Sequence, residues 1–478
     1  MSFYLAVDLG TTGCRSIVFD KHFESVAAEY EEYSLITPKE NYVEQDANVW
    51  WEITLRTAKK AIEKSGIDGQ KIESISISSQ GITIVPVDDG FVPLYNALTW
   101  LDTRAEEETK QIEKDFSNEK IYSLTGKPVS AAYTLPKILW LRNNLPEIYN
   151  KAKKFLMPMD FLLAKFTGKC VTDYSMASGT LMYDIKNFCW SREILDFYGI
   201  QEDKLPSLLA SGTSLGVVLP SVAKKLGLKN DCVVAVGAQD QKCAAYGVGL
   251  EEGTMTISLG TAAAITKYWK TANTQTNNGV GWCGYVDNKS FVTEGVINTA
   301  GTSLRWIRDM LFKNEKYDLI DKEAQDALNR GSSLLFLPYL AGASSPDYYP
   351  ESQGVFYGVN LATVRGDFAL AVMEGIAFQI RSILEAMNAY GNVHSLILFG
   401  GGAKSDFWCS LIANITGLKI SVPKNSEAAG AGAAMLAAKS VEETYTSIKI
   451  EKVYSPKDEK AYEEKYLKYL TLEKKLWR

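Results

Sequence analysis

A strand pattern that ends in a glycine–threonine turn occurs twice in this chain, at its start and just past its middle. The first copy is Leu5-Ala6-Val7-Asp8-Leu9-Gly10-Thr11-Thr12, and the second is Gly253-Thr254-Met255-Thr256-Ile257-Ser258-Leu259-Gly260-Thr261. Apolar strand patterns mixed with helical ones surround both copies. This repetition of the pattern indicates two α/β domains with a cleft between them. We place the domains at residues 1–247 and 248–478.

Composition narrows the possible functions. A chain of 478 residues is too long for one ordinary core, and its net charge of −6 argues against a nucleic-acid surface. The seven cysteines include no CxxC pair, which is typical of reduced thiols rather than a zinc or redox motif. No leader pattern precedes the first strand, and no apolar run reaches the roughly 18 residues that span a bilayer. We therefore expect a soluble cytoplasmic protein without membrane or nucleic-acid contacts.

Strand and helix patterns can be assigned to both halves. Apolar strand runs lie at 3–8, 15–20, 24–33, 72–78, 231–236, 253–259 and 395–399. Helical patterns lie at 47–65, from 244 onward, at 427–438 and at 455–478. The helix at 427–438 is rich in Gly and Ala, which suits close packing. The last one, rich in Lys, Glu and Tyr, predicts an amphipathic surface helix.

The turn Asp8-Leu9-Gly10-Thr11-Thr12 has the groups that a phosphate site needs. A glycine at a strand end permits a tight turn, and successive amide N–H groups with two hydroxyls can surround phosphate oxygens. Asp8 could hold Mg²⁺, and Arg15 on the next strand could reach the same phosphates. An ordinary hairpin turn capped by Asp is the alternative. Two further glycine turns, Ser258 to Thr261 and Phe399 to Ala403, favour a nucleotide held between the halves.

Proton chemistry is expected to rest on carboxylates. The only two histidines, His22 and His394, lie in a polar turn and just before an apolar strand. Asp240, in the turn Gly237-Ala238-Gln239-Asp240-Gln241, follows a buried strand and precedes an apolar helix. An Asp there can accept the proton of a hydroxyl that attacks a γ-phosphate, although it can equally serve as a helix N-cap.

Taken together, these motifs resemble those of the FGGY carbohydrate kinases over nearly the whole chain. The matching segments, in the order of the family, are Asp8 to Thr12, Val43 to Asp46, Trp100 to Arg104, Thr125 to Pro128, Thr172 to Ser175, Gly237 to Gln241, Ser258 to Thr261, Gly301 to Trp306, Phe336 to Gly342, Gly400 to Ser405 and Glu427 to Gly430. The resemblance implies two RNase H-like domains of the actin/hexokinase/Hsp70 ATPase type, with the catalytic cleft between them. It also implies ATP and Mg²⁺ as cofactors and a small sugar or polyol as substrate.

The resemblance implies a role for individual residues as well. Asp240 would be the general base, Gln241 a substrate contact and Asp8 the residue that organises Mg²⁺. The other substrate residues would be Gln80, Gly81, Ile82, Trp100, Asp102 and Tyr133. The nucleotide residues would be Gly10, Thr11, Thr12, Arg15, Gly260, Thr261, Gly301, Arg305, Gly401, Gly402 and Ser405.

Departures from the family bear on the substrate. Glycerol kinases have Arg-Glu where this chain has Gly81-Ile82 and a Tyr where it has Ala132, which argues against glycerol. The segment from Thr125 to Trp140 is similar to xylulose kinases, but those have a His where this chain has Ile82. A ketopentose such as xylulose is the leading expectation, with another ketose, a sugar acid such as gluconate, or a polyol of the glycerol or erythritol type as alternatives. A non-catalytic sugar sensor and an actin- or chaperone-like ATPase are rival functions, and a homodimer is left open.

Overall fold

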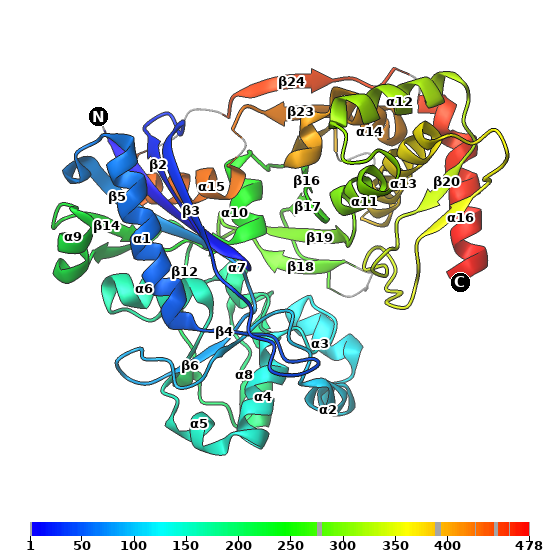
Figure 1. The fold of residues 1–478 in the computed structure, drawn as a ribbon. Helices are drawn as coiled ribbons and strands as arrows, with labels where there is room; N and C mark the ends of the chain where they lie inside the picture. Colours follow the sequence, from blue (N-terminus) through cyan, green and yellow to red (C-terminus); the bar gives the residue numbers. More distant parts are fainter. Residues whose placement is uncertain are drawn as a thin grey trace.

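The computed structural model describes residues 2–274, 280–387, 393–425, 427–443, 448–457 and 459–477. Two mixed sheets form the centres of two halves, which lie side by side in Figure 1. A third group of helices and short strands, coloured cyan to green, hangs below the first sheet. Within the described ranges, no helix combines the length and apolar character needed to cross a membrane.

The first sheet has the strand order β13-β14-β5-β1-β2-β3. Its bounds are β1 (Phe3–Leu9), β2 (Gly13–Asp20), β3 (Ser25–Glu32), β5 (Ile72–Ser79), β13 (Ser214–Val217) and β14 (Val233–Ala235), with β15 (Ala238–Gln239) as a further partner of β5. Strands β1, β2 and β3 are antiparallel neighbours, whereas β5 and β14 run parallel to β1. Helix α1 (Ala47–Ser65), capped by Asp46, joins the two groups and packs on the sheet.

The second sheet repeats this arrangement in the order β18-β19-β17-β16-β22-β23-β24. Its bounds are β16 (Thr254–Leu259), β17 (Ala263–Trp269), β18 (Gly281–Gly284), β19 (Phe291–Ile297), β22 (Ser395–Phe399), β23 (Lys419–Pro423) and β24 (Ile450–Tyr454). Strand β16 is antiparallel to β17 and parallel to β22, as β1 is to β2 and β5. Two similar α/β halves were expected from the repeated glycine–threonine turn, and the strand order confirms them.

Helices and short strands complete both halves. Those of the first half are β4 (Glu44–Gln45), β6 (Val85–Val87), β7 (Ala97–Leu98), α2 (Glu106–Phe116), α3 (Asn118–Thr125), α4 (Thr134–Asn144), α5 (Pro146–Lys151), β8 (Lys154–Leu156), α6 (Pro158–Thr167), β9 (Val171–Asp173), α7 (Tyr174–Ala177), β10 (Tyr183–Asp184), β11 (Cys189–Trp190), α8 (Arg192–Tyr198), β12 (Ser207–Leu209), α9 (Pro220–Leu226) and α10 (Asp240–Gly247). Those of the second half are α11 (Gly301–Leu311), α12 (Tyr317–Asn329), β20 (Leu335–Leu337), β21 (Val355–Tyr357), α13 (Arg365–Ala386), α14 (Asp406–Thr416), α15 (Ala428–Lys439) and α16 (Glu463–Trp477).

Helix α15 belongs to the second half of the sequence but packs on the first sheet, against β1, β5 and helix α10. Its alanines share an apolar cluster with Tyr4, Ala6 and Phe19. The contact with α10 is made by backbone. A Cβ atom on Gly432 would lie 1.9 Å from the Cys243 carbonyl oxygen, and one on Gly247 would lie 2.1 Å from that of Ala428. Only glycine fits at either position.

The two halves also make contact at the outer edge of the second sheet, where β18 packs against the first half. The Trp282 amide donates to the Gly126 carbonyl at 2.8 Å, and the Tyr122 hydroxyl donates to the Val280 carbonyl at 2.8 Å. Residues of β18 and β19 therefore join the wall of any site formed by the first half.

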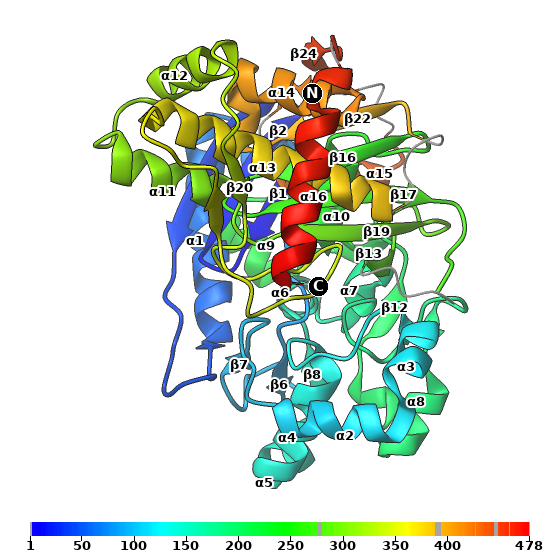
Figure 2. The same cartoon turned by 90° about the vertical axis from the view of Figure 1, so that its right-hand side faces the viewer.

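Most expected elements are found within one or two residues of their predicted bounds. The helix expected from 244 begins earlier, at Asp240, because the Gln239 side chain caps it by accepting from the amides of Gln241 and Lys242. The last helix, α16, lies across the second half (Figure 2). Its Tyr466 and Tyr469 are buried. The helix expected over 455–478 begins later than predicted, at Glu463, after a 3₁₀ turn at Glu459–Tyr462, and Asp458 and Arg478 lie outside the described residues.

We predict that Gly432→Ala destabilises the protein. The added methyl group meets a backbone carbonyl, so α15 and α10 must separate, and the loss should reach or exceed the upper end of the range of about 1–3 kcal/mol for overpacking. Thermal unfolding measures the effect. Gly90→Ala is the matched control, since the nearest atom to its new Cβ would be 3.4 Å away on an exposed loop. Equal melting temperatures for the two variants would contradict the prediction.

Candidate active site

A cavity of about 310 Å³ opens between the first half and the β18–β19 edge. This volume lies at the lower end of the range for small-molecule sites, about 300–1,000 Å³. The predicted site residues that line it are Thr11, Gln80, Gly81, Ile82, Trp100, Tyr133, Asp240 and Gln241. The cavity has six further polar lining residues to which the sequence analysis assigned no role, and these are Lys127, Ser175, Gln239, Lys242, Cys283 and Glu294.

Asp240 is held at the first position of helix α10 by a close backbone approach. A Cβ on Gly237 would lie 1.6 Å from the Ile77 carbonyl oxygen, so only glycine lets this segment run against β5. Strand β15 then continues along β5, and the Gln239 amide donates to the Ser175 hydroxyl at 2.9 Å. The Asp240 carboxylate accepts from the Gln241 amide at 2.7 Å. The carboxylate is therefore fixed in position on the cavity wall.

The surroundings of Asp240 bring the pKa of its carboxyl group close to neutral pH. Burial raises the pKa of Asp240 to about 7, and the nearby charge of Asp8 adds to the increase. The Lys242 ammonium opposes it. A carboxyl group with this pKa can accept a proton near neutral pH and release it again, which is what a general base requires.

Asp8 lies at the carboxyl end of β1, opposite Arg15 in the sheet register, and accepts from the Ser78 hydroxyl at 2.9 Å. Burial raises the pKa of Asp8 to about 6. The Ser78 hydrogen bond lowers this pKa, and the nearby Glu427 carboxylate raises it. Asp8 and Asp240 thus form a pair of neighbouring carboxylates that resist ionising together.

Hydrogen bonds hold the turn that follows β1 in place and engage its Gly10 amide, its Thr11 carbonyl and its Thr11 hydroxyl. The side-chain amide of Gln45 donates to the Thr11 carbonyl at 2.6 Å, and the backbone amide of Gly10 donates to the Gly13 carbonyl at 2.9 Å. Trp100 donates to the Thr11 hydroxyl at 2.9 Å, and Thr12 is exposed.

Arg15 lies close to this turn but already has a partner. Its guanidinium forms an ion pair with Glu427, at the start of α15. Contact with phosphates would require it to share or leave that carboxylate.

Asp8 also bears on the expected magnesium ion. Within the described residues, no group of three His, Cys, Asp or Glu side chains could hold a metal. Mg²⁺ usually keeps several waters and binds one or two carboxylates together with substrate phosphates, rather than a closed protein cage. A half-buried Asp8 beside a phosphate-type turn has the chemistry of such a ligand, so the residues present fit the ion.

The second glycine–threonine turn leads to the N-terminus of a helix. The amides of Gly301 and Thr302 donate to the carbonyls of Gly260 and Thr261 at 2.9 and 3.1 Å. A Cβ on Gly301 would lie 2.5 Å from the Gly260 oxygen, so the approach requires glycine. The positive end of α11 thus lies beside the turn, an arrangement that favours anions. Arg305, on the same helix, is exposed.

The third turn lies next to the second because β22 runs parallel to β16 and both strands end at the same edge. Gly400 adopts a φ of 92°, which favours glycine, and a Cβ on Gly402 would meet the Leu259 side chain at 2.4 Å. Gly401 faces open space. Ser405 caps helix α14 by accepting from the Trp408 amide at 3.0 Å. These turns do not line the 310 Å³ cavity; they form a separate edge suited to a nucleotide.

One wall of the cavity is apolar where sugar-binding groups were expected. Ile82 has a φ of 55°, an unusual backbone for a β-branched residue, and its side chain packs so closely on Gly179 that a Cβ there would lie 2.2 Å away. Gln80 directs its amide to the Gln45 side chain at 2.9 Å and accepts from Thr83. Ile82 therefore offers no side-chain hydrogen bond to a substrate, and the Gln80 side chain is held by these two protein partners.

Charged side chains from both halves meet at another part of the lining. Lys242 of α10 forms an ion pair with Glu294 of β19, and both side chains are largely buried. Burial alone would raise the pKa of Glu294, but Lys242 and Lys127 hold it below its usual value. The sequence offered one signal for Glu294, a single acidic residue inside the apolar run Phe291 to Ile297. Its partners, distant in sequence, could not be inferred.

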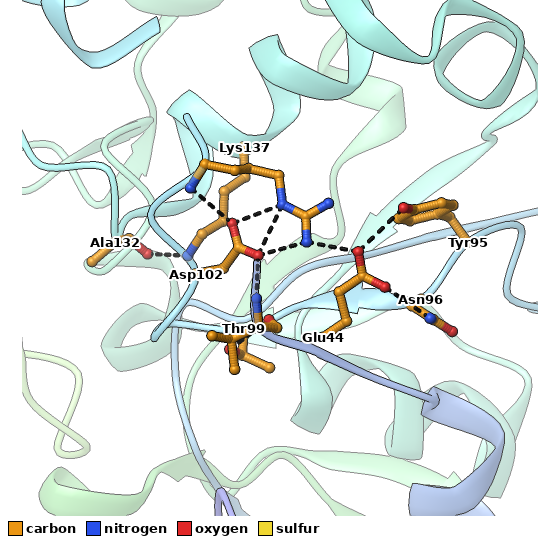
Figure 3. A network of polar contacts seen from close by, with 9 residues as sticks. Glu44, Tyr95, Asn96, Thr99, Asp102, Ala132 and Lys137 are labelled. Atoms are coloured by element: carbon orange, nitrogen blue, oxygen red, sulfur yellow. Dashed lines mark hydrogen bonds and ion pairs between the residues drawn. The ribbon is translucent and has the colours of Figure 1, made fainter. Parts of the chain in front are cut away.

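Asp102 was predicted to contact substrate, but it does not line the cavity. Its carboxylate is fully buried in an ion pair with Arg104 at 2.6 Å and accepts from the Val43 amide at 2.7 Å (Figure 3). Arg104 also pairs with Glu44 at 2.6 Å. Figure 3 places Lys137 beside Asp102, donating to the carbonyl of Ala132.

This network joins the segment that carries Trp100 to the segment that carries Tyr133. Both of these residues line the cavity. Asp102 therefore acts on the cavity through its neighbours, as a positioning residue.

The geometry described so far agrees with what is found among known proteins. The chain matches the "FGGY family of carbohydrate kinases, N-terminal domain" over residues 3–247 and the corresponding C-terminal domain over residues 255–441. A xylulose kinase of Staphylococcus epidermidis is 32% identical over 476 residues, which cover 97% of this chain and 95% of that protein.

Solved structures show the same likeness. A ligand-bound xylulose kinase of Lactobacillus acidophilus superposes with a TM-score of 0.92 at 26% identity, covering 100% of this chain and 98% of that one. A gluconate kinase of the same organism gives 0.92 at 26% identity, with 99% and 98% covered. The fold and the matched models therefore define a carbohydrate kinase. The chain belongs to the FGGY family, as the sequence motifs had indicated.

We predict that the pH dependence of kcat/KM for the sugar reflects the raised pKa of Asp240. A protonated base cannot accept the hydroxyl proton, so activity should rise up to about pH 7 and level off above it. Lys242→Met should move this limb to higher pH, because the ammonium lowers the pKa of Asp240, and Lys242→Arg should leave it in place. A limb near pH 4 in every variant would show that Asp240 is not the titrating base.

We also predict that Asp102→Asn destabilises the protein. The change leaves Arg104 buried with Glu44 as its one carboxylate, and removing one partner of a buried ion pair costs about 3–5 kcal/mol. Thermal melting measures the loss. Glu107→Gln, which breaks an exposed pair with Lys110, serves as control and should hardly change the melting temperature. Unchanged melting of Asp102→Asn would show that the network is not structural.

Proposed function

We propose that this carbohydrate kinase transfers the γ-phosphoryl group of ATP to a terminal hydroxyl of a small open-chain sugar, with Asp240 as general base. The observation that supports this most directly is the position of Asp240. Its carboxylate lies on the wall of a sugar-sized cavity, next to Asp8, and burial raises its pKa to about 7.

Each step assigns a task to residues of the chain. The sugar enters the cavity beneath Trp100 and presents a terminal hydroxyl to Asp240. The hydroxyl oxygen attacks the γ-phosphorus, the bond from that phosphorus to the β–γ bridging oxygen breaks, and ADP leaves. Asp240 takes the hydroxyl proton. Because phosphoryl transfer passes through a loose transition state, the protein contributes chiefly positioning and charge stabilisation.

The glycine turns are proposed to hold the nucleotide. Gly10, Thr11 and Thr12 of the first half and Gly260 and Thr261 of the second would bind the phosphates. Gly301, Arg305, Gly401, Gly402 and Ser405 would border the nucleoside. Asp8 would hold Mg²⁺, which neutralises the negative charge that develops on the phosphate oxygens. Residues 1–247 would then carry most of the sugar site and 248–478 most of the nucleotide site.

Xylulose is the first substrate to test, because it is the substrate named for the Staphylococcus epidermidis and Lactobacillus acidophilus relatives. A sugar acid is the next, because the second Lactobacillus acidophilus structure is a gluconate kinase. The apolar wall at Ile82 distinguishes this chain within the proposal, since it offers no hydrogen bond to a sugar hydroxyl. We place the reaction in the cytoplasm, where ATP is available.

We predict that Asp240→Asn lowers kcat by about 10²–10⁴-fold, the usual contribution of a general base, while ATP still binds. ADP release is measured with a panel of pentuloses, hexuloses, sugar acids and polyols, and nucleotide affinity by calorimetry. Glu107→Gln, which removes an exposed carboxylate that does not line the cavity, should leave kcat unchanged. Near-wild-type turnover of Asp240→Asn would disprove the base, and sugar-independent ATP hydrolysis by the wild type would disprove the kinase proposal.

A further inference from the structure

A buried lysine on the cavity wall has no role in the reaction described above. Lys127 follows helix α3 and the left-handed Gly126, whose φ is 72°. It lines the cavity with 6% of its surface exposed. Burying an ammonium group is costly unless a negative or strongly accepting group compensates it. A negatively charged or strongly accepting partner is therefore expected beside the Lys127 ammonium group.

Within the described part of the chain, no carboxylate lies within the 4 Å of an ion pair with Lys127. The carboxylate that acts on its charge is Glu294, whose ion pair is with Lys242. The other close group is the thiol of Cys283, a weak hydrogen-bonding partner. Of these two buried ammonium groups, Lys242 has its carboxylate in an ion pair, whereas Lys127 has none within the described residues.

The ammonium of Lys127 has space made for it at the edge of the second sheet. A Cβ on Gly281 would lie 2.6 Å from Nζ, so the glycine is what lets the side chain extend here. The Trp282–Gly126 hydrogen bond fixes the two backbones beside it. Lys127 and Asp240 both line the cavity, and Lys127 does so beside the β18 edge. One substrate can therefore contact Lys127 with one group while it presents a hydroxyl to Asp240.

The apolar part of the lining cannot provide this recognition. Gly81, Ile82, Met176 and Gly179 line the cavity without a hydrogen-bonding side chain. An ammonium group has three donors and no acceptor, and its strongest hydrogen bonds are made with charged acceptors. A sugar hydroxyl satisfies such a group poorly, whereas a carboxylate satisfies both its donors and its charge.

We propose that Lys127 forms a carboxylate subsite where β18 borders the cavity, so that this kinase prefers a sugar acid of five or six carbons to the neutral sugar of the same length. The inference rests on the proposed kinase function and changes its preferred substrate class. The transferred groups are the same as before, and the carboxylate is unaltered by the reaction.

The wild-type enzyme provides the first test, as kcat/KM for matched probes. Xylonate is compared with xylulose, gluconate with fructose, and fructose 1-phosphate represents another anion at the same end of the chain. We expect the acids to be the better substrates. A preference for xylulose and fructose would overturn the inference, and a preference for fructose 1-phosphate would replace the carboxylate by a phosphate. If none of the probes releases ADP, the proposed function itself fails.

Variants then assign the preference to the lysine. Lys127→Met should lower kcat/KM for the acid about 10- to 150-fold, the loss of one charge-assisted hydrogen bond, and change that for the neutral sugar less than about threefold. Lys127→Arg should restore part of the loss, and Gly281→Ala, which displaces Nζ, should act in the same direction as Lys127→Met. Lys120→Met, an exposed lysine of α3, is the control. An equal loss for acid and neutral sugar in Lys127→Met would show a structural role and overturn the assignment.

Discussion

The contact between helices α10 and α15 is the constraint on which the candidate active site depends. It is made by backbone atoms, because Gly247 and Gly432 leave no room for a side chain. Helix α10 begins with Asp240. Helix α15 begins next to Glu427, which pairs with Arg15 and raises the pKa of Asp8. One helix of the second half therefore fixes the position of the proposed base and influences the charge state of the proposed magnesium ligand.

The same packing accounts for the electrostatics of the site. Covering the carboxyl ends of β1 and β15 removes water from Asp8 and Asp240, and two neighbouring carboxylates in such a place do not readily ionise together. The balancing ammonium group of Lys242 is itself held by Glu294 from the other half, so the proton affinity of the base depends on how the two halves meet.

The sequence was most informative where a pattern is local. Strands β1 and β16, their glycine turns and the position of Asp240 follow from short-range features, and the family motifs supplied their order. Contacts between distant segments were not predictable in this way. The ion pair of Lys242 with Glu294 joins residues 52 positions apart, and nothing near Lys127 indicated that β18 would cover it. Asp102 illustrates a further limit, because its motif marks it as important without showing that its side chain faces Arg104 instead of the cavity.

The packing of α15 has a consequence for the way the chain folds as it is made. The helix covers a face of the first sheet and packs there against the apolar side chains of Tyr4, Ala6, Ile17 and Phe19. Residues 428–439 lie near the end of the chain, so they leave the ribosome only when most of the protein has been made. Domains generally fold as units in order of synthesis, but here the first sheet must keep an apolar face open until the second half has been translated. During that interval the nascent protein offers chaperones, and neighbouring chains, a surface that the finished enzyme no longer has.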